Sequence, residues 1–160
     1  MNIFINTSIV TGVIPAAWKH SIVVPIHKSG DADLPNNYRP ISLLPILSKI
    51  LEKIITSQLT EYLETNNIIS NTQHGFRGSL STQTALLTLT NELYENIDKK
   101  KISLLTLCDL SKAFDSVSHN ILIRKCNDMN IDSFWFKDYH SNRTQSVRMR
   151  TSVSSKRDVT

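Results

Sequence analysis

The stretch Leu104–Asp115, LLTLCDLSKAFD, places an acidic residue directly after an apolar run. Residues 102–110 are almost continuously apolar, which predicts a central strand covered on both faces. Asp109 would lie at the end of this strand, where a carboxylate is costly to bury without a partner. Mg²⁺ is a suitable partner because hard cations prefer oxygen ligands. The structural alternative is that Asp109 caps the next turn or pairs with a lysine.

The composition is that of one globular domain or of a piece of a larger one. The chain has 160 residues, of which 40% are hydrophobic and 20% are charged. Its net charge of +4 mildly favours a polyanionic partner, although a basic protein without a nucleic-acid role fits as well. We expect no membrane span and no signal peptide, and therefore an intracellular protein, in the nucleus or the cytoplasm. The His and Cys spacing disfavours zinc, and Cys108 is predicted to be buried.

The remaining pattern predicts a mixed α and β fold with helices before and after the central strand. Lys19–His27 is predicted to be a strand, with Pro25 at an edge or a bend, and Lys28–Pro40 a polar loop. The tail around residues 147–153 is predicted to form a hairpin, with its turn near Ser154 or beyond. Helices are predicted at about residues 45–66, 81–99 and 120–129. The second would begin at a Ser81 or Thr82 cap, follow a loop at 70–80, and bury the stripe Ala85, Leu86, Leu89, Leu93, Tyr94 and Ile97.

Three basic residues lie in or beside the predicted loops. Lys28 follows the first strand, Arg39 belongs to the NYRP sequence at 37–40, and Arg77 lies between two glycines. Such cations suit a triphosphate or a nucleic-acid backbone, although each one alone is more often a solvated surface residue. No Walker-type glycine-rich loop is present, which disfavours a P-loop nucleotidase.

Several blocks follow one another along the chain: GVIPAAWK at 12–19, VPIHKSG at 24–30 with NYRPISLL at 37–44, QHGFR at 73–77 with Ser81-Thr82, DLSKAFD at 109–115, and SNR at 141–143. In this order they resemble the reverse transcriptases of non-LTR (LINE-type) retrotransposons. The resemblance implies a right-hand polymerase fold of the α/β (α+β) class, incomplete here. Residues of about 1–100 would be fingers-like, and residues of about 101–160 would begin the palm.

The resemblance also implies the chemistry, which is two-metal transfer of dNTPs to a primer 3′-OH on an RNA template. Asp109 would be the first catalytic, metal-binding aspartate of a site for two Mg²⁺ ions, and the Leu110 backbone carbonyl would join it. Phe114 matches the bulky position that would clash with a ribose 2′-OH and so favour dNTPs. The implied partners are an RNA template, a DNA primer or target, and dNTPs.

The basic loops acquire roles from the same resemblance. Lys28 and Arg39 match the fingers positions that touch the dNTP triphosphate. Arg77, Gln73 and Gly75 match a block near the template or primer.

Two later blocks of the family do not occur in the 160 residues, namely the Pro-Gln-Gly block and the aromatic-x-Asp-Asp turn. A single carboxylate cannot hold two Mg²⁺ ions in a catalytic arrangement. We therefore expect this chain alone to be inactive, as a fragment of a polymerase domain that lacks the later palm motifs and the thumb. The alternative is a non-catalytic retroelement relic or an RNA-binding module with the same fold.

Overall fold

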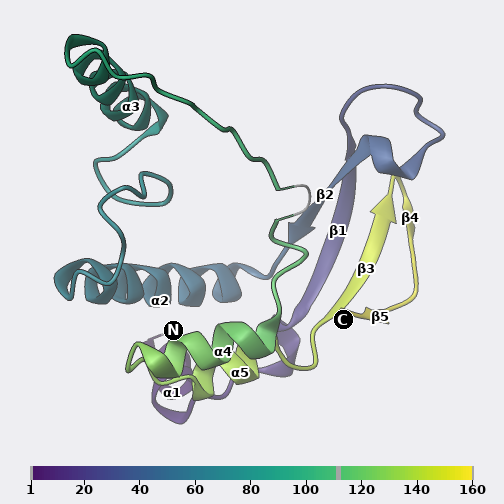
Figure 1. Ribbon diagram of the computed structural model, residues 1–160. Coiled ribbons are helices and arrows are strands. Elements are labelled where there is room, and N and C mark those ends of the chain that lie inside the picture. The colour runs from purple at the N-terminus through teal and green to yellow at the C-terminus, as the bar shows by residue number, and fades with distance from the viewer. Residues whose placement is uncertain (1, 111–112, 160) are drawn as a thin grey trace. The chain divides into compact units, whose positions relative to one another are not determined.

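The computed structural model describes residues 2–110 and 113–159 and combines helices with a five-stranded sheet (Figure 1). Among these residues, four successive helices separate the first two strands from the last three. The predicted mixed α and β class is confirmed. The described residues form two compact units. The first combines the residues up to Ile55 with those from Val117 onward, and the second spans Thr56–Ser116. The predicted fingers and palm boundaries concern polymerase subdomains and stay a prediction.

The sheet belongs to the first unit and is centred on one long strand. Its members are β1 (His20–His27), β2 (Tyr38–Leu43), β3 (Thr144–Met149), β4 (Ser152–Val153) and β5 (Arg157–Asp158). The order is β2-β1-β3-β4, and β5 also pairs with β3. Strand β1 runs antiparallel to β2 and parallel to β3. The sheet therefore joins residues that lie about 120 positions apart in the sequence.

Prolines lie within the first two strands, and the pairing accommodates both of them. Pro25 is directly opposite Pro40, and neither residue has an N–H to donate. The parallel pairing of β1 with β3 ends at Val23, so Pro25 lies where β2 alone flanks the strand. The predicted first strand is confirmed. It is not an edge strand, because β2 and β3 flank it, and only its end around Pro25 lacks β3. The predicted loop to Pro40 was too long, because β2 already begins at Tyr38.

The described helices agree with the apolar spacing. They are α1 (Asn2–Thr11), α2 (Ile46–Thr65), α3 (Thr82–Asp98), α4 (His119–Asp128) and α5 (Phe134–His140), with short 3₁₀ turns η1 (Ala16–Trp18) and η2 (Pro35–Asn37). The predictions that correspond to α2, α3 and α4 are confirmed within one or two residues at each end. Ser81 caps α3, since its Oγ accepts the Thr84 N–H while the Thr84 Oγ1 accepts the Ser81 N–H. No helix among residues 2–110 and 113–159 is long and apolar enough to span a membrane.

The predicted central strand at residues 102–110 is wrong. These residues form no strand and run as extended chain (Figure 1). Ile102 and Leu104 are 100% and 93% exposed. Cys108, predicted to be buried, is exposed as well. An apolar run becomes a buried strand only when other strands pair with it and helices cover it. No described strand pairs with this segment.

The apolar stripe of α3 is also less covered than predicted. None of its residues is buried, and Leu86, Tyr94 and Ile97 are each 64% exposed. The capping box and the helical spacing are sufficient to explain a helix here, but they do not determine what lies against it. The predicted tail hairpin is confirmed, with its turn at Arg150 and Thr151 rather than near Ser154 or later.

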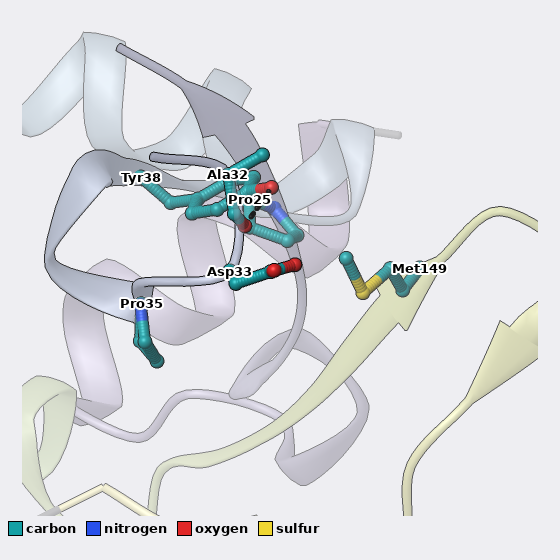
Figure 2. Close-up of a pocket in the computed structure, with 6 residues that line it drawn as sticks. All are labelled: Pro25, Ala32, Asp33, Pro35, Tyr38 and Met149. Carbon is teal, nitrogen blue, oxygen red and sulfur yellow. Dashed lines mark hydrogen bonds between the residues drawn. The ribbon is translucent and has the colours of Figure 1, made fainter. Parts of the chain in front are cut away.

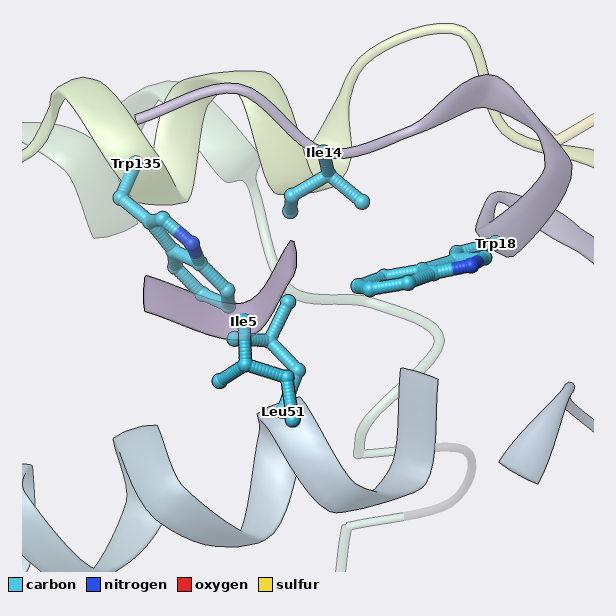
Figure 3. Close-up of a cluster of buried hydrophobic side chains, with 5 residues drawn as sticks. All are labelled: Ile5, Ile14, Trp18, Leu51 and Trp135. Atoms are coloured by element: carbon cyan, nitrogen blue, oxygen red, sulfur yellow. The ribbon is translucent and has the colours of Figure 1, made fainter. Parts of the chain in front are cut away.

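The core of the first unit collects apolar side chains from five separate places along the chain. Figure 3 shows them as a cluster between helices: Ile5, Ile14, Trp18, Leu51 and Trp135. The Trp135 ring stacks on Tyr139 at 5.0 Å, and the Tyr139 hydroxyl donates to the Glu52 carboxylate at 2.7 Å. Burial and this carboxylate raise the pKa of Tyr139 to about 12. The core thereby ties α5 to the first half of α2.

The end of α1 depends on a glycine. Gly12 has a φ of +67°, which is the left-handed conformation that often follows a helix. A Cβ at this position would lie 2.2 Å from the Phe134 ring. A side chain here would therefore meet both a strained backbone and the start of α5.

A buried ion pair connects the segment before β1 to α5. The Lys19 ammonium lies 3.0 Å from Asp138 Oδ2, and the Lys19 side chain is only 7% exposed. The Ile14 N–H donates to the same oxygen at 2.7 Å, and the Thr144 N–H donates to the Lys19 carbonyl at 3.1 Å. Burial alone would raise the pKa of the Asp138 carboxyl, but the Ile14 N–H and Lys19 outweigh it and hold that pKa below its ordinary value.

Removing the Asp138 charge should destabilise the first unit strongly. Asp138→Asn leaves the Lys19 ammonium buried without a counter-charge. We expect the free energy of unfolding to fall by about 2–3 kcal/mol, somewhat less than for fully buried pairs. Urea denaturation at neutral pH measures this loss. The exposed Asp128→Asn change serves as the control and should alter stability by less than about 0.5 kcal/mol.

The same pair predicts a pH dependence with a definite sign. A carboxyl whose pKa is depressed in the folded state stabilises the fold above its unfolded pKa of about 3.9. That stabilisation disappears as the pH falls through the lower, folded-state pKa. The stability gap between the unmodified chain and Asp138→Asn should therefore narrow below about pH 4. An unchanged gap down to pH 2 would contradict the role given to the pair.

Candidate functional site

The two predicted triphosphate contacts lie on one exposed face of the sheet. Arg39 on β2 is directly opposite Ile26 on β1. Directly opposed residues in a sheet point to the same face, as do residues two apart along one strand. The Lys28 N–H donates to the Asn37 carbonyl at 2.8 Å, so the ladder continues one residue beyond β1. Lys28, Ile26 and Arg39 therefore share a face, which we call the cationic face.

The loop that follows Lys28 is held by Asn37. The Asn37 Nδ2 donates to the Asp31 carbonyl at 2.7 Å, while its own carbonyl accepts the Lys28 N–H. Gly30 has a φ of +83°, and a Cβ there would lie 2.8 Å from Asn37 Nδ2. The tight packing of Gly30 on Asn37 fixes the backbone on both sides of Lys28.

Strand β3 adds a third cation to this face. Val147 lies beside Val23 in the last pair of the parallel ladder, and Arg148 is the next residue of β3. Side chains alternate between the two faces along a strand, so Arg148 points away from the face of Val147 and Val23. Arg148 is therefore on the same face as Ile26 and Arg39. The sequence-based reasoning missed it, because only the parallel pairing of β1 with β3 reveals its position. The alternation of apolar and polar residues at 147–153 predicts the hairpin, but it does not predict that β3 pairs with β1.

The opposite face carries a shallow pocket beside the loop after β1. Figure 2 shows its lining residues: Pro25, Ala32, Asp33, Pro35, Tyr38 and Met149. Its volume is about 250 Å³, and the Tyr38 hydroxyl donates to the Ala32 carbonyl at 2.8 Å. The rings of Tyr38 and His27 also meet edge to face at 5.3 Å. These contacts support the loop from the face that Lys28 and Arg39 do not occupy.

In the second unit, Arg77 makes hydrogen bonds that hold its own loop against α2. Its guanidinium makes two hydrogen bonds to the Glu64 carboxylate, at 2.7 and 2.5 Å, and it also donates to the carbonyls of Ser70 and Gln73. The hydrogen bond from Arg77 lowers the pKa of the Glu64 carboxyl. Arg77 thus ties the loop at 70–78 to the end of α2. Gln73 and Gly75 are exposed on this loop, and the Gln73 amide donates to the Gly75 carbonyl at 3.3 Å.

The same loop presents a ring to Phe114. The rings of Phe76 and Phe114 meet edge to face with their centroids 6.0 Å apart, and they are 89% and 80% exposed. Phe76 has a φ of +62°, an uncommon conformation for a bulky residue. Of the predicted site residues, Phe114 is thus brought next to the loop that contains Gln73, Gly75 and Arg77.

Asp109 and Leu110 are exposed in the extended segment after α3. Ser111 and Lys112 of the same block lie outside the described residues. The Asp109 side chain makes no hydrogen bond or ion pair with any described residue. Neither a capping bond nor a pair with a lysine is therefore seen for it among those residues. Nor do the described ranges contain three or more His, Cys, Asp or Glu side chains placed to share a metal ion.

Comparison with protein families gives a match over most of the chain. The family model described as reverse transcriptase (RNA-dependent DNA polymerase) matches residues 26–157. The chain belongs to the reverse transcriptase family. Its sequence is related to the reverse transcriptases of non-LTR retrotransposons, which confirms the resemblance seen in the sequence blocks.

Individual relatives come from mobile elements of insects. The chain is 34% identical to the probable RNA-directed DNA polymerase from transposon BS of Drosophila melanogaster, over 88% of this chain and 16% of the relative. It is 34% identical to the RNA-directed DNA polymerase from mobile element jockey of the same species, over 75% and 13%. The Pol polyprotein from retrotransposable element R2 of Popillia japonica is 27% identical, over 81% and 18%. The chain thus spans less than a fifth of the length of these curated relatives.

Reverse transcriptases generally use divalent metal ions, and the residues present fit this use only in part. The Asp109 carboxylate and the Leu110 carbonyl are oxygen donors, which hard cations prefer. Their number is insufficient, because Asp109 belongs to no group of three or more His, Cys, Asp or Glu side chains within the described ranges. We therefore derive no catalytic step from this chain alone.

The bracing role of Arg77 predicts a specific effect on its loop. Arg77→Lys retains the charge but cannot reproduce the forked contact with Glu64 or reach both backbone carbonyls at once. Amide hydrogen exchange should become faster at residues 70–78 and stay unchanged in α4. Arg124→Lys, on the exposed surface of α4, is the matched control and should leave the loop protected. Equal exchange in both variants would show that Arg77 does not hold the loop.

Proposed function

We propose that this chain is part of an RNA-directed DNA polymerase that adds dNTPs to a primer 3′-OH on an RNA template. The family match over residues 26–157 carries the proposal, because it includes every proposed site residue from Lys28 to Phe114. The expected partners are an RNA template, a DNA primer or target, and dNTPs. Residues of about 1–100 would belong to the fingers and those of about 101–160 to the beginning of the palm. Such work implies an intracellular location.

Lys28 and Arg39 are proposed to bind the triphosphate of the incoming dNTP. Their common position on the cationic face supports this role, because a polyanion can contact both side chains at once. Both side chains are exposed, and neither makes an ion pair with a described residue. The guanidinium of Arg39 can form two parallel hydrogen bonds to phosphate oxygens, while Lys28 supplies a point charge.

Asp109 is proposed to be one of the carboxylates that hold two Mg²⁺ ions, with the Leu110 carbonyl as a neighbouring ligand. The ions, when bound, would activate the primer hydroxyl and stabilise the charge on the transferred phosphate. The absence of any described partner for the Asp109 carboxylate supports a role outside the fold itself. A free carboxylate followed by a backbone carbonyl is the donor type that Mg²⁺ selects.

Phe114 is proposed to exclude ribonucleotides by contact at the sugar. Its ring is exposed, and its aromatic contact among the described residues is the edge-to-face one with Phe76, so the ring is available to a ligand. The loop with Gln73 and Gly75 is proposed to lie along the template or primer. In that proposal Arg77 acts through its bonds to Glu64 and the loop carbonyls, which set the loop conformation.

Primer extension tests the role of Asp109. We expect the 160-residue chain alone to show no Mg²⁺-dependent dNTP incorporation on a primed RNA template. A hybrid in which it replaces the matching segment of the jockey polymerase should be active. Asp109→Asn in that hybrid should lower the rate by more than about 100-fold, beyond what loss of an outer-shell partner costs. Asp98→Asn, at the end of α3, should have little effect. Incorporation by the isolated chain, or an active Asp109→Asn hybrid, would overturn the proposal.

The same hybrid tests the sugar discrimination. Phe114→Ala removes the ring that would meet a 2′-hydroxyl, so the preference for dNTPs over rNTPs should fall by about tenfold or more. The ratio of the two kcat/KM values measures this preference. Tyr94→Ala, at another exposed aromatic residue, on α3, is the control and should leave the ratio unchanged. A ratio unaffected by Phe114→Ala would remove Phe114 from the site.

A further inference from the structure

The cationic face includes a third basic residue, Arg148, whose position could not be predicted from the sequence. Arg148 follows Val147, the last residue of β3 that pairs with β1. The alternation of side chains along β3 places it on the side of the sheet that carries Ile26 and Arg39. We propose that Arg148 binds the phosphates of the incoming nucleotide together with Lys28 and Arg39. This inference rests on the proposed function and adds a residue to it.

The spacing of the strands allows Arg39 and Arg148 to contact one ligand. They flank β1 on its two sides and are offset by about two residues along it. Neighbouring strands are about 4.8 Å apart and each residue rises about 3.3 Å, so the two backbones are about 12 Å apart. Both side chains are long, and their stems can lie over the apolar surface of β1. Ile26, which is 53% exposed, provides part of that surface. The two guanidinium groups can therefore meet an anion above the end of β1.

Arg148 is also free of competing partners within the described ranges. It is exposed and makes no hydrogen bond or ion pair with a described residue. Arg143, five residues earlier, differs, because it donates to the Tyr139 carbonyl and lies 4.5 Å over the Tyr139 ring. The neighbour of Arg148 on β4 is the apolar Val153. Asp158 shares the face but lies opposite Thr144, about 13 Å further along β3 at 3.3 Å per residue.

Arg157 provides a matched control in the same sheet. It is exposed and pairs with Gln145, which lies beside Ser21. Its side chain therefore belongs to the face opposite Arg148. Substituting either arginine by glutamine lowers the net charge by one. A general electrostatic effect would act on both variants equally, whereas a contact on the cationic face would act on Arg148 alone.

Binding of inorganic tripolyphosphate and of dNTP to the 160-residue chain, measured by calorimetry at low salt, tests the proposal. We expect Arg148→Gln to weaken binding about tenfold, as loss of a charge-assisted hydrogen bond would. Arg157→Gln should weaken it less than twofold. Arg148→Lys should recover part of the loss because it restores the charge. Thermal unfolding of each variant confirms that the fold is retained.

The outcomes separate this inference from the proposed function. Equal binding by Arg148→Gln and Arg157→Gln would overturn the role of Arg148, while losses in Lys28→Gln and Arg39→Gln would still support the triphosphate site. A loss for a single-stranded oligonucleotide, with tripolyphosphate binding unchanged, would overturn the nucleotide assignment in favour of a nucleic-acid backbone. If the unmodified chain does not bind tripolyphosphate at all, both proposals for this face are wrong.

Discussion

The ammonium of Lys19 and the carboxylate of Asp138 meet inside the first unit, and the arrangement of the sheet depends on this contact. Lys19 immediately precedes β1, and Asp138 lies in α5, shortly before β3. The Thr144 N–H bonds to the Lys19 carbonyl, so the two strands start side by side. A shift of one residue between β1 and β3 would move every following side chain to the other face. The ion pair thus favours the register in which these residues share the cationic face.

Burying an ion pair to favour this register costs desolvation free energy. Two charges lose hydration, and their attraction recovers that cost only when the remaining hydrogen-bonding groups are satisfied. Here Asp138 Oδ2 also accepts the Ile14 N–H, while the Lys19 ammonium lies 3.5 Å from the Ser141 hydroxyl. An apolar pair of similar size could pack as well but would tolerate sliding. The polar contact is directional, so it favours one alignment of strands that are distant in sequence.

The sequence predicts the elements well where a local signal determines them. The 3.6-residue period of apolar residues predicts α2, and Ser81 as a capping residue predicts the start of α3. It fails where tertiary context decides. The apolar run at 102–110 does not form a strand. An apolar pattern favours burial, but a buried strand also needs neighbouring strands and covering helices, which the pattern itself does not provide. Lys28 and Arg39 are predictable as a pair from their motifs. Arg148 is not, because its position depends on pairing between segments about 120 residues apart.

The second unit shows how an exposed residue can be positioned without a core. Phe114 is 80% exposed and has only the Phe76 ring against it as a described aromatic contact. Phe76 in turn lies in a loop with a strained φ, and such a conformation persists only when surrounding contacts enforce it. Those contacts come from Arg77, which joins the loop carbonyls to Glu64. The position of the Phe114 ring therefore depends, through Phe76, on an ion pair in which Phe114 takes no part.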